Sequence, residues 1–104
     1  MQDLSYPETM IKQPAIYIIT NKSRTVLYTG VTADLAKRLR EHQDGTGSIF
    51  TRKYSCHILI YYENFPDMRQ AIEREKYIKN RTRAWKLALI YAMNPELKDL
   101  ADGI

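Results

Sequence analysis

Short apolar runs near the start of the chain give way to helically spaced apolar positions toward its end. Residues 15–20 and 25–30 are rich in β-branched and aromatic side chains, which predicts two strands joined over residues 21–24 as a β-hairpin. Residues 56–63 are apolar on both faces, so a third strand is expected there, covered on both sides. Residues 1–13 lack periodicity and are expected to form an irregular lead-in.

Cap residues predict the helices around these strands. Thr32 is expected to cap a helix over residues 33–42, and the glycine-containing stretch from there to about residue 54 is expected to be a loop. Three more helices are expected, each beginning after a cap residue. The first covers about residues 68–80 and follows Asp67, which can form a capping box with Gln70. The others cover residues 83–93, after Thr82, and about 95–101, after Asn94. The order ββαβααα, with no repeated βαβ unit, predicts an α/β (α+β) fold: a small three-stranded antiparallel or mixed sheet flanked by helices.

Length and composition are those of one globular domain. The 104 residues allow a single domain over 1–104, and 44% apolar with 27% charged residues is usual for a folded chain. No apolar run approaches the roughly 18 residues needed to span a bilayer, so a cytoplasmic protein without membrane contact is expected. Cys56 is the only cysteine, which excludes an internal disulfide and a cysteine-rich zinc site. Any bound metal is therefore expected to be held mainly by oxygen.

Positive charge is concentrated in the middle of the chain. The formal net charge is +4, but residues 69–86 alone carry seven Lys or Arg against two Glu. A polyanion such as nucleic acid fits such a stretch, and so does a solvated helix face whose long basic side chains lie over apolar surface. Charge alone leaves both interpretations open.

Two tyrosines occupy the predicted hairpin. A turn centred between Lys22 and Ser23 sets Tyr17 directly opposite Tyr28, with Cβ atoms about 4.5–5.5 Å apart. Both phenols are then expected on one face of the sheet, either in a functional site or as an ordinary aromatic pair.

Arg38 and His42 lie four residues apart on one face of the first predicted helix, next to its inward apolar stripe. They are expected at the rim of the core, where a guanidinium can hydrogen-bond two phosphate oxygens at once. There is an alternative interpretation for each residue. Arg38 is then an ordinary surface charge, and His42 is a residue near the end of a helix, where the helix dipole favours a positive charge.

Glu75 lies in the middle of the inward face predicted for the second long helix, together with Met68, Ala71, Ile72 and Ile78. A carboxylate in such a place must be paired, protonated or bound to metal, because burying it alone is costly. The alternatives are a structural ion pair, with the arginine of the first helix or another base, and a magnesium ligand.

The motif AIY at residues 15–17 and the motif YTG at 28–30, followed at set distances by Arg38, His42 and Glu75, resemble the GIY-YIG nuclease superfamily. Members include homing endonucleases, restriction enzymes and the bacterial excision-repair nuclease. The sequence differs from the family motifs at two positions. Ala15 stands where the first motif has glycine, and Thr29 replaces the middle residue of the second motif. The residues replaced at these positions take no part in the chemistry.

The resemblance covers about residues 15–100 and is most specific toward small stand-alone bacterial members. It implies that Tyr17 and Tyr28 are the motif tyrosines, Arg38 the phosphate-binding arginine, His42 an active-site histidine and Glu75 the metal ligand. Family enzymes differ over which group is the general base, and Tyr28 is our preferred candidate. Gly30 and Asn94 are expected to support the site.

The function expected from the resemblance is metal-dependent hydrolysis of phosphodiester bonds in DNA, with Mg²⁺ or Mn²⁺, directed by DNA structure and serving repair or recombination. The basic residues expected to contact nucleic acid are Arg52, Lys53, Arg74, Lys79 and Arg83. The alternatives are a nucleic-acid-binding module with weak or no cleavage and an interaction subunit targeted by a protein partner. A monomer is expected.

Overall fold

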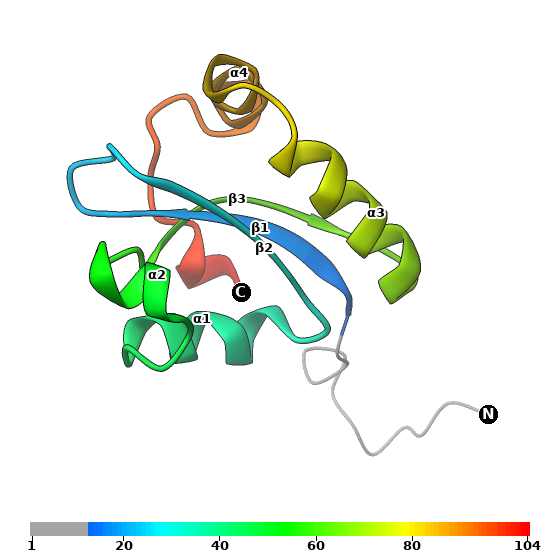
Figure 1. Cartoon of the computed structure of the whole chain (residues 1–104), viewed down its shortest axis with the longest axis horizontal. Coiled ribbons are helices and arrows are strands. Elements are labelled where there is room, and N and C mark those ends of the chain that lie inside the picture. Colours follow the sequence, from blue (N-terminus) through cyan, green and yellow to red (C-terminus); the bar gives the residue numbers. More distant parts are fainter. Residues whose placement is uncertain (1–12) are drawn as a thin grey trace.

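Three antiparallel strands form the centre of the molecule (Figure 1). The computed structural model describes residues 13–104, so nearly all of the expected irregular lead-in lies outside the described residues. The strands are β1 (Ala15–Thr20), β2 (Leu27–Thr32) and β3 (Ile58–Asn64), in the order β2-β1-β3. Every residue of the central strand β1 is buried. The predicted α+β class with a three-stranded sheet is confirmed, and the sheet is wholly antiparallel.

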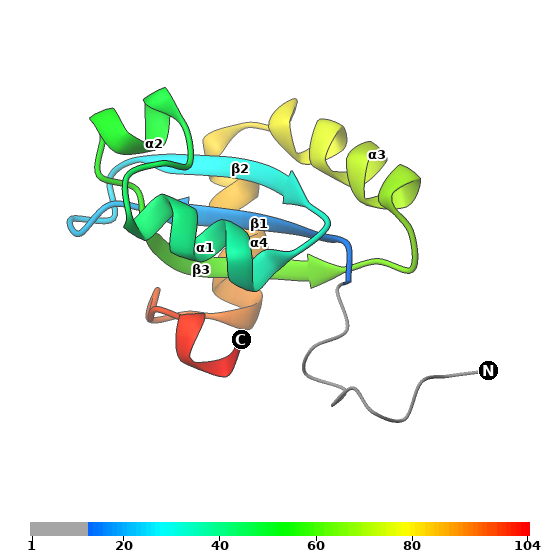
Figure 2. The same ribbon diagram turned by 90° about the horizontal axis from the view of Figure 1, so that it is seen from below.

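Helices cover both faces of this sheet. They are α1 (Leu35–Gln43), α2 (Ile49–Lys53), α3 (Met68–Lys79) and α4 (Arg83–Met93), and a 3₁₀ turn, η2 (Ala101–Gly103), follows them. Figures 1 and 2 show α1 and α3 on opposite sides of the strands. Because side chains alternate along a strand, Ile16 and Ile18 of β1 pack in one apolar cluster, whereas Tyr17 and Ile19 pack in the other. Tyr17 therefore belongs to the α1 side.

The hairpin loop is longer than predicted, and the predicted register is wrong. The side-chain oxygen of Asn21 accepts hydrogen bonds from the backbone N–H groups of Thr25 and Val26, at 2.9 and 3.1 Å, and so holds the loop open. Strand β2 begins only after this loop, and Tyr17 lies opposite Gly30 instead of Tyr28. The register differs by two residues, so Tyr28 still shares a face of the sheet with Tyr17.

Two expectations about the segment after β2 are corrected. The cap of α1 is Asp34, whose carboxylate accepts from the Lys37 N–H, whereas the Thr32 hydroxyl accepts from the Asp34 N–H instead. The expected loop contains α2, which begins after Ser48 because that hydroxyl accepts from the Thr51 N–H at 3.1 Å. A helix of one turn shows too little periodicity to be found in the sequence.

The caps predicted for α3 and α4 are confirmed. Asp67 accepts from the Gln70 N–H at 2.9 Å, and Thr82 accepts from the Trp85 N–H at 3.1 Å. The expected burial of β3 is also confirmed, since its first four residues are buried. No helix among residues 13–104 is long and apolar enough to cross a membrane.

The helix expected after Asn94 is wrong. The buried Asn94 side chain does not cap a helix: its amide donates to the backbone oxygens of Ile60 and Lys98, at 3.0 and 2.8 Å. Leu97 then takes a positive φ of 52°, which an α-helix does not allow. The chain passes the outer edge of β3, where the Leu100 N–H donates to the Leu59 oxygen at 2.7 Å.

Candidate active site

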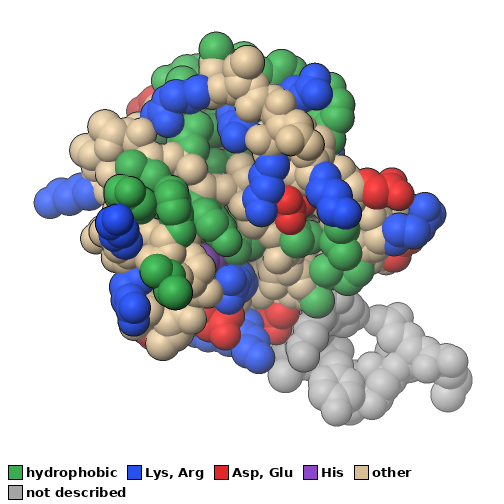
Figure 3. All heavy atoms as spheres, viewed as in Figure 1, with side chains coloured by type: hydrophobic (Ala, Val, Ile, Leu, Met, Phe, Trp, Pro, Cys, Tyr) green, Lys and Arg blue, Asp and Glu red, His purple; other side chains and the backbone are tan. Residues whose placement is uncertain are grey.

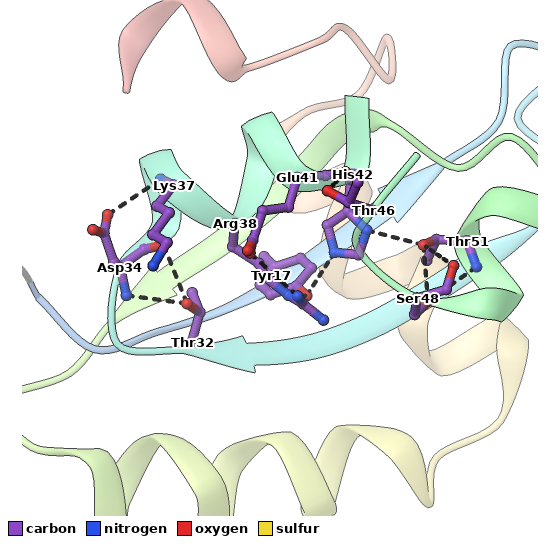
Figure 4. A network of polar contacts seen from close by, with 10 residues as sticks. All are labelled: Tyr17, Thr32, Asp34, Lys37, Arg38, Glu41, His42, Thr46, Ser48 and Thr51. Carbon is purple, nitrogen blue, oxygen red and sulfur yellow. Dashed lines mark hydrogen bonds and ion pairs between the residues drawn. The ribbon is translucent and has the colours of Figure 1, made fainter. Parts of the chain in front are cut away.

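Three of the predicted site residues meet on the α1 side of the sheet (Figure 4). Tyr17 extends from β1 and is 1% exposed, yet its hydroxyl has two polar partners on α1. The Arg38 Nε–H donates to the Tyr17 oxygen at 3.3 Å, and His42 Nε2 lies 2.9 Å from the same oxygen. Residues four apart on a helix share a face, which explains how both reach one phenol.

The direction of these hydrogen bonds follows from burial. Tyr17 accepts from Arg38, and its own buried O–H needs an acceptor, which His42 Nε2 supplies. The other ring nitrogen, Nδ1, then carries the proton and donates to the Thr51 hydroxyl at 3.0 Å. Thr51 in turn donates to the Ser48 backbone oxygen at 3.3 Å. Arg38 therefore begins a chain of donors that runs through the core to α2.

Burial sets the protonation states of this chain. It raises the pKa of Tyr17 to about 12, and the contact with Arg38 opposes this only in part. Burial first, and then the positive charge of Arg38, lower the pKa of His42 to about 4. Both groups are therefore neutral near pH 7. His42 is 5% exposed and lies deeper than the predicted rim, and as a neutral ring it does not act as the cation that the helix dipole favours.

Tyr28 completes the cluster from the neighbouring strand. Its ring centroid lies 6.4 Å from that of Tyr17 and 5.8 Å from that of His42. Unlike Tyr17, it is only partly buried, and none of the hydrogen bonds within residues 13–104 involves its hydroxyl. Tyr28 is the phenol of the pair that remains open to water.

Arg38 lies at the rim, as expected, with 28% of its side chain exposed. Its Nε is held by Tyr17 and its Nη1 by Glu41, at 3.3 Å each, and it lines an open depression between the end of β2 and α1. A guanidinium has five N–H groups, so this arrangement fixes its plane and leaves other N–H groups free to meet an anion.

Residues of the Gly45–Tyr54 segment, expected only as a loop with a basic patch, complete the site. Thr51 anchors His42, and the ring of Phe50 stacks on Tyr28 with centroids 5.7 Å apart. Gly47 lies against His42 so closely that an added Cβ would overlap the imidazole. The only signal in the sequence for α2 was Ser48, a residue type that often caps helices. Such a residue predicts a helix only when a longer periodic pattern follows it, and α2 is too short to show one.

Gly30, predicted to support the site, makes room for Tyr17. It faces Tyr17 across the hairpin, and a Cβ added to it would overlap the phenol ring and its oxygen. Only glycine lets the tyrosine lie flat over β2 and reach α1.

Gly30→Ala is therefore expected to displace the Tyr17 ring and destabilise the protein by about 1–3 kcal/mol, the usual cost of overpacking a core. Thermal unfolding measures the loss of stability. Gly103→Ala is the matched control, since a Cβ there meets nothing within 4 Å. Equal melting temperatures for Gly30→Ala and the parent chain would contradict this role.

Glu75 occupies a different element, α3, and its predicted surroundings are only partly correct. Its side chain is 13% exposed, but Ile72, assigned to the same inward face, is 37% exposed. Its ion-pair partner is Lys79, at 3.2 Å, and not Arg38. None of the hydrogen bonds or ion pairs within residues 13–104 joins Glu75 to the tyrosines or to Arg38. Figure 3 shows acidic atoms set among Lys and Arg atoms over α3, on the face where a histidine is also visible.

A metal site at Glu75 has no cluster of three protein ligands to draw on among residues 13–104, because no three His, Cys, Asp or Glu side chains there lie close enough to hold an ion together. Glu75 therefore does not fit a closed zinc site. It fits a hard cation such as Mg²⁺, which keeps several waters and completes its ligands with substrate phosphate.

The five basic residues expected to contact nucleic acid differ in whether they already bind other groups of the protein. Arg52 and Lys53 are exposed on α2. Arg74 is committed within the protein, because its Nε and Nη2 both donate to the Glu63 carboxylate at 3.0 Å. Lys79 pairs with Glu75, and Arg83 donates to the Thr25 backbone oxygen at 2.8 Å.

Asn94, the other expected supporting residue, is not brought to the cluster. In β3, Tyr61 pairs with Ile18 and Leu59 pairs with Ile19, so Ile60 has no partner on β1. The Asn94 amide donates to the oxygen of Ile60, which makes it a structural residue of the β3 edge.

The fold and these motifs match known proteins. The family model described as the GIY-YIG catalytic domain matches residues 13–88. A UPF0213 protein of Clostridium perfringens is 44% identical over 75 residues, which cover 72% of this chain and 80% of the relative. A UPF0213 protein of Streptococcus agalactiae is 38% identical over 81 residues, covering 78% and 92%.

A solved structure has the same architecture. The solution NMR structure of a UPF0213 protein from Bacillus halodurans superposes with a TM-score of 0.54, at 26% identity, and covers 84% of this chain and 92% of that one. The family match, the similar relatives and the similar fold agree with one another. The chain belongs to the GIY-YIG nuclease family.

Proposed function

We propose that this protein hydrolyses phosphodiester bonds in DNA in a metal-dependent reaction. One observation carries the proposal: Arg38 is held by Tyr17 at the wall of an open depression, on the side of the sheet where Tyr28 leaves its hydroxyl accessible. A fixed guanidinium beside an accessible phenol is suited to a phosphate under attack by water.

Arg38 binds two oxygens of the scissile phosphate and stabilises the charge that develops on them in the transition state. Tyr17 keeps the guanidinium in place and, being neutral with a raised pKa, does not itself take a proton. Tyr28, in its deprotonated form, orients the attacking water and accepts its proton as the new P–O bond forms; the bond to the leaving oxygen breaks, and that oxygen takes up a proton from solvent.

Glu75 would hold the cation. When bound, that cation would draw charge from the phosphate and make nearby water and phenol easier to deprotonate, which a phenol requires before it can act as a base. The carboxylate of Glu75 is held by the Lys79 ammonium, a pair that a divalent cation can displace because half of the lysine side chain is exposed.

A binding module without cleavage is the second candidate. The Lys79–Glu75 ion pair favours it, since it satisfies the carboxylate with no metal present. The retained set of Tyr17, Tyr28, Arg38 and Glu75 favours the enzyme, because a binding surface needs basic residues but not a buried phenol chain.

A cleavage screen tests the proposal. Single-stranded, nicked, flapped and branched DNA, with matched RNA, are incubated with the protein in Mg²⁺, in Mn²⁺ and in EDTA, since repair and recombination intermediates are the proposed targets. We expect cleavage of DNA that stops in EDTA. Binding without cleavage of any substrate in either metal would select the binding module instead.

A further inference from the structure

The aromatic side chains of α2 continue outward from the candidate active site. The Phe50 ring lies 5.7 Å from that of Tyr28 with an interplanar angle of 29°, and the Tyr54 ring lies 4.7 Å from that of Phe50. Tyr28 in turn contacts Tyr17 and His42. The rings form a row that begins in the core and ends at the surface.

The outer two rings are exposed in a way that the core does not explain. Phe50 is 43% exposed and Tyr54 is 41% exposed, and neither is a member of the two apolar clusters that pack against the sheet. Figure 3 shows a band of hydrophobic atoms crossing this face toward the histidine, with Lys and Arg atoms beside it. Exposed rings next to a site are available to a ligand.

Positive charge accompanies the rings. Arg52 and Lys53 are exposed on the same helix turn, and the Lys53 ammonium lies 5.4 Å from the centre of the Tyr54 ring. Aromatic faces for bases and cations for phosphates are the two elements by which proteins bind single-stranded nucleic acid. In a duplex the faces of the bases are already stacked on one another, so only unpaired bases can stack on these rings.

We propose that Phe50 and Tyr54 form a stacking subsite for unpaired bases that flank the scissile phosphate, so that the substrate strand is single-stranded where it is cut. This inference rests on the proposed function, which places the phosphate at Arg38. Tyr28 joins the two sites, because its ring contacts both the Tyr17 side of the cluster and Phe50.

Binding in EDTA tests the subsite without cleavage. The probes are a labelled single-stranded oligonucleotide, the same oligonucleotide with abasic positions in its centre, and the matching duplex, measured by fluorescence anisotropy. Phe50→Leu and Tyr54→Leu keep apolar volume but remove the ring. Each is expected to weaken binding of the intact single strand about 5-fold to 100-fold, since one stacked base contributes on this scale.

The abasic strand separates stacking from every other effect. It keeps the phosphates but lacks the bases, so the two variants and the parent chain are expected to bind it, and the duplex, within about twofold of one another. Tyr54→Phe keeps the ring and is expected to bind like the parent chain. Ile49→Ala is the matched control, because this side chain is 79% exposed on the same helix and has no ring.

The outcomes distinguish the inference from the proposed function. If the parent chain cleaves DNA but both Leu variants bind the intact strand as tightly as it does, the subsite is rejected while the nuclease stands. Equal losses on intact and abasic strands also reject it, because the rings then do not contact bases. Absence of nucleic-acid binding by the parent chain would overturn both and leave the rings to a protein partner. Melting curves confirm folding, and Tyr54→Leu gives the result independently if Phe50→Leu disturbs Tyr28.

Discussion

Replacing Glu75 with glutamine is expected to reduce cleavage at least about 100-fold in both Mg²⁺ and Mn²⁺, because the amide keeps the shape of the side chain but loses the charge that binds a hard cation. Stability should change little. The Glu75–Lys79 pair has a half-exposed lysine, and such pairs contribute about 0–1 kcal/mol. DNA binding should persist or tighten, since an acid is removed from a basic surface.

Glu73→Gln is the control for this variant. Glu73 lies on the same helix and also pairs with a base four residues away, Arg69, but its side chain is 67% exposed. We expect it to cleave at the parent rate. Cleavage, melting temperature and DNA affinity are measured for both variants. A Glu75→Gln protein that cleaves normally would show that Glu75 holds no catalytic metal, and one that unfolds would show a structural ion pair.

Replacing Arg38 with alanine is expected to slow cleavage by about 10²–10³, the usual cost of removing one donor to the transition state. The variant also frees the Tyr17 oxygen from one of its two partners, but the hydrogen bond to His42 remains, so the fold should persist. Arg38→Lys is expected to recover little, because an ammonium cannot bind Tyr17, Glu41 and phosphate in one plane.

Arg40→Ala tests whether the effect is local. Arg40 is exposed on the same helix, two residues away, and its loss removes an equal charge from the surface. Single-turnover rates for the two alanine variants, at matched folded fractions, decide the role of Arg38. Equal rates for Arg38→Ala and the parent chain would remove it from the mechanism.

Much of the site could be predicted from the sequence because its geometry tolerates error. The predicted hairpin register was wrong by two residues, yet Tyr17 and Tyr28 share a face, since only an odd shift moves a side chain to the other side of a sheet. Arg38 and His42 were predicted to lie together because residues four apart share a face of a helix. The predicted cap, Thr32, was wrong, but the true cap, Asp34, begins the same helix and leaves this spacing unchanged.

What the sequence did not predict depends on contacts between distant segments. The depth of His42 is set by Thr51 and by the lack of a side chain at Gly47. The signals at Asn94 were those of a helix start, but a hydrogen bond to Ile60, in a strand 34 positions earlier, has priority over a local cap. Local sequence patterns do not show which of two competing hydrogen bonds will form in the folded protein.

The path of the C-terminal segment past β3 affects whether the sheet edge can pair with another protein molecule. Sheet edges with free N–H and C=O groups promote pairing between chains. Here the Leu59 oxygen is taken by the Leu100 N–H and the Leu59 N–H by the Asp99 carboxylate, at 2.7 and 3.3 Å. The C-terminal segment thus covers the sheet edge at Leu59 with one backbone and one side-chain hydrogen bond, and a chain shortened to Met93 would expose this strand to pairing with other chains.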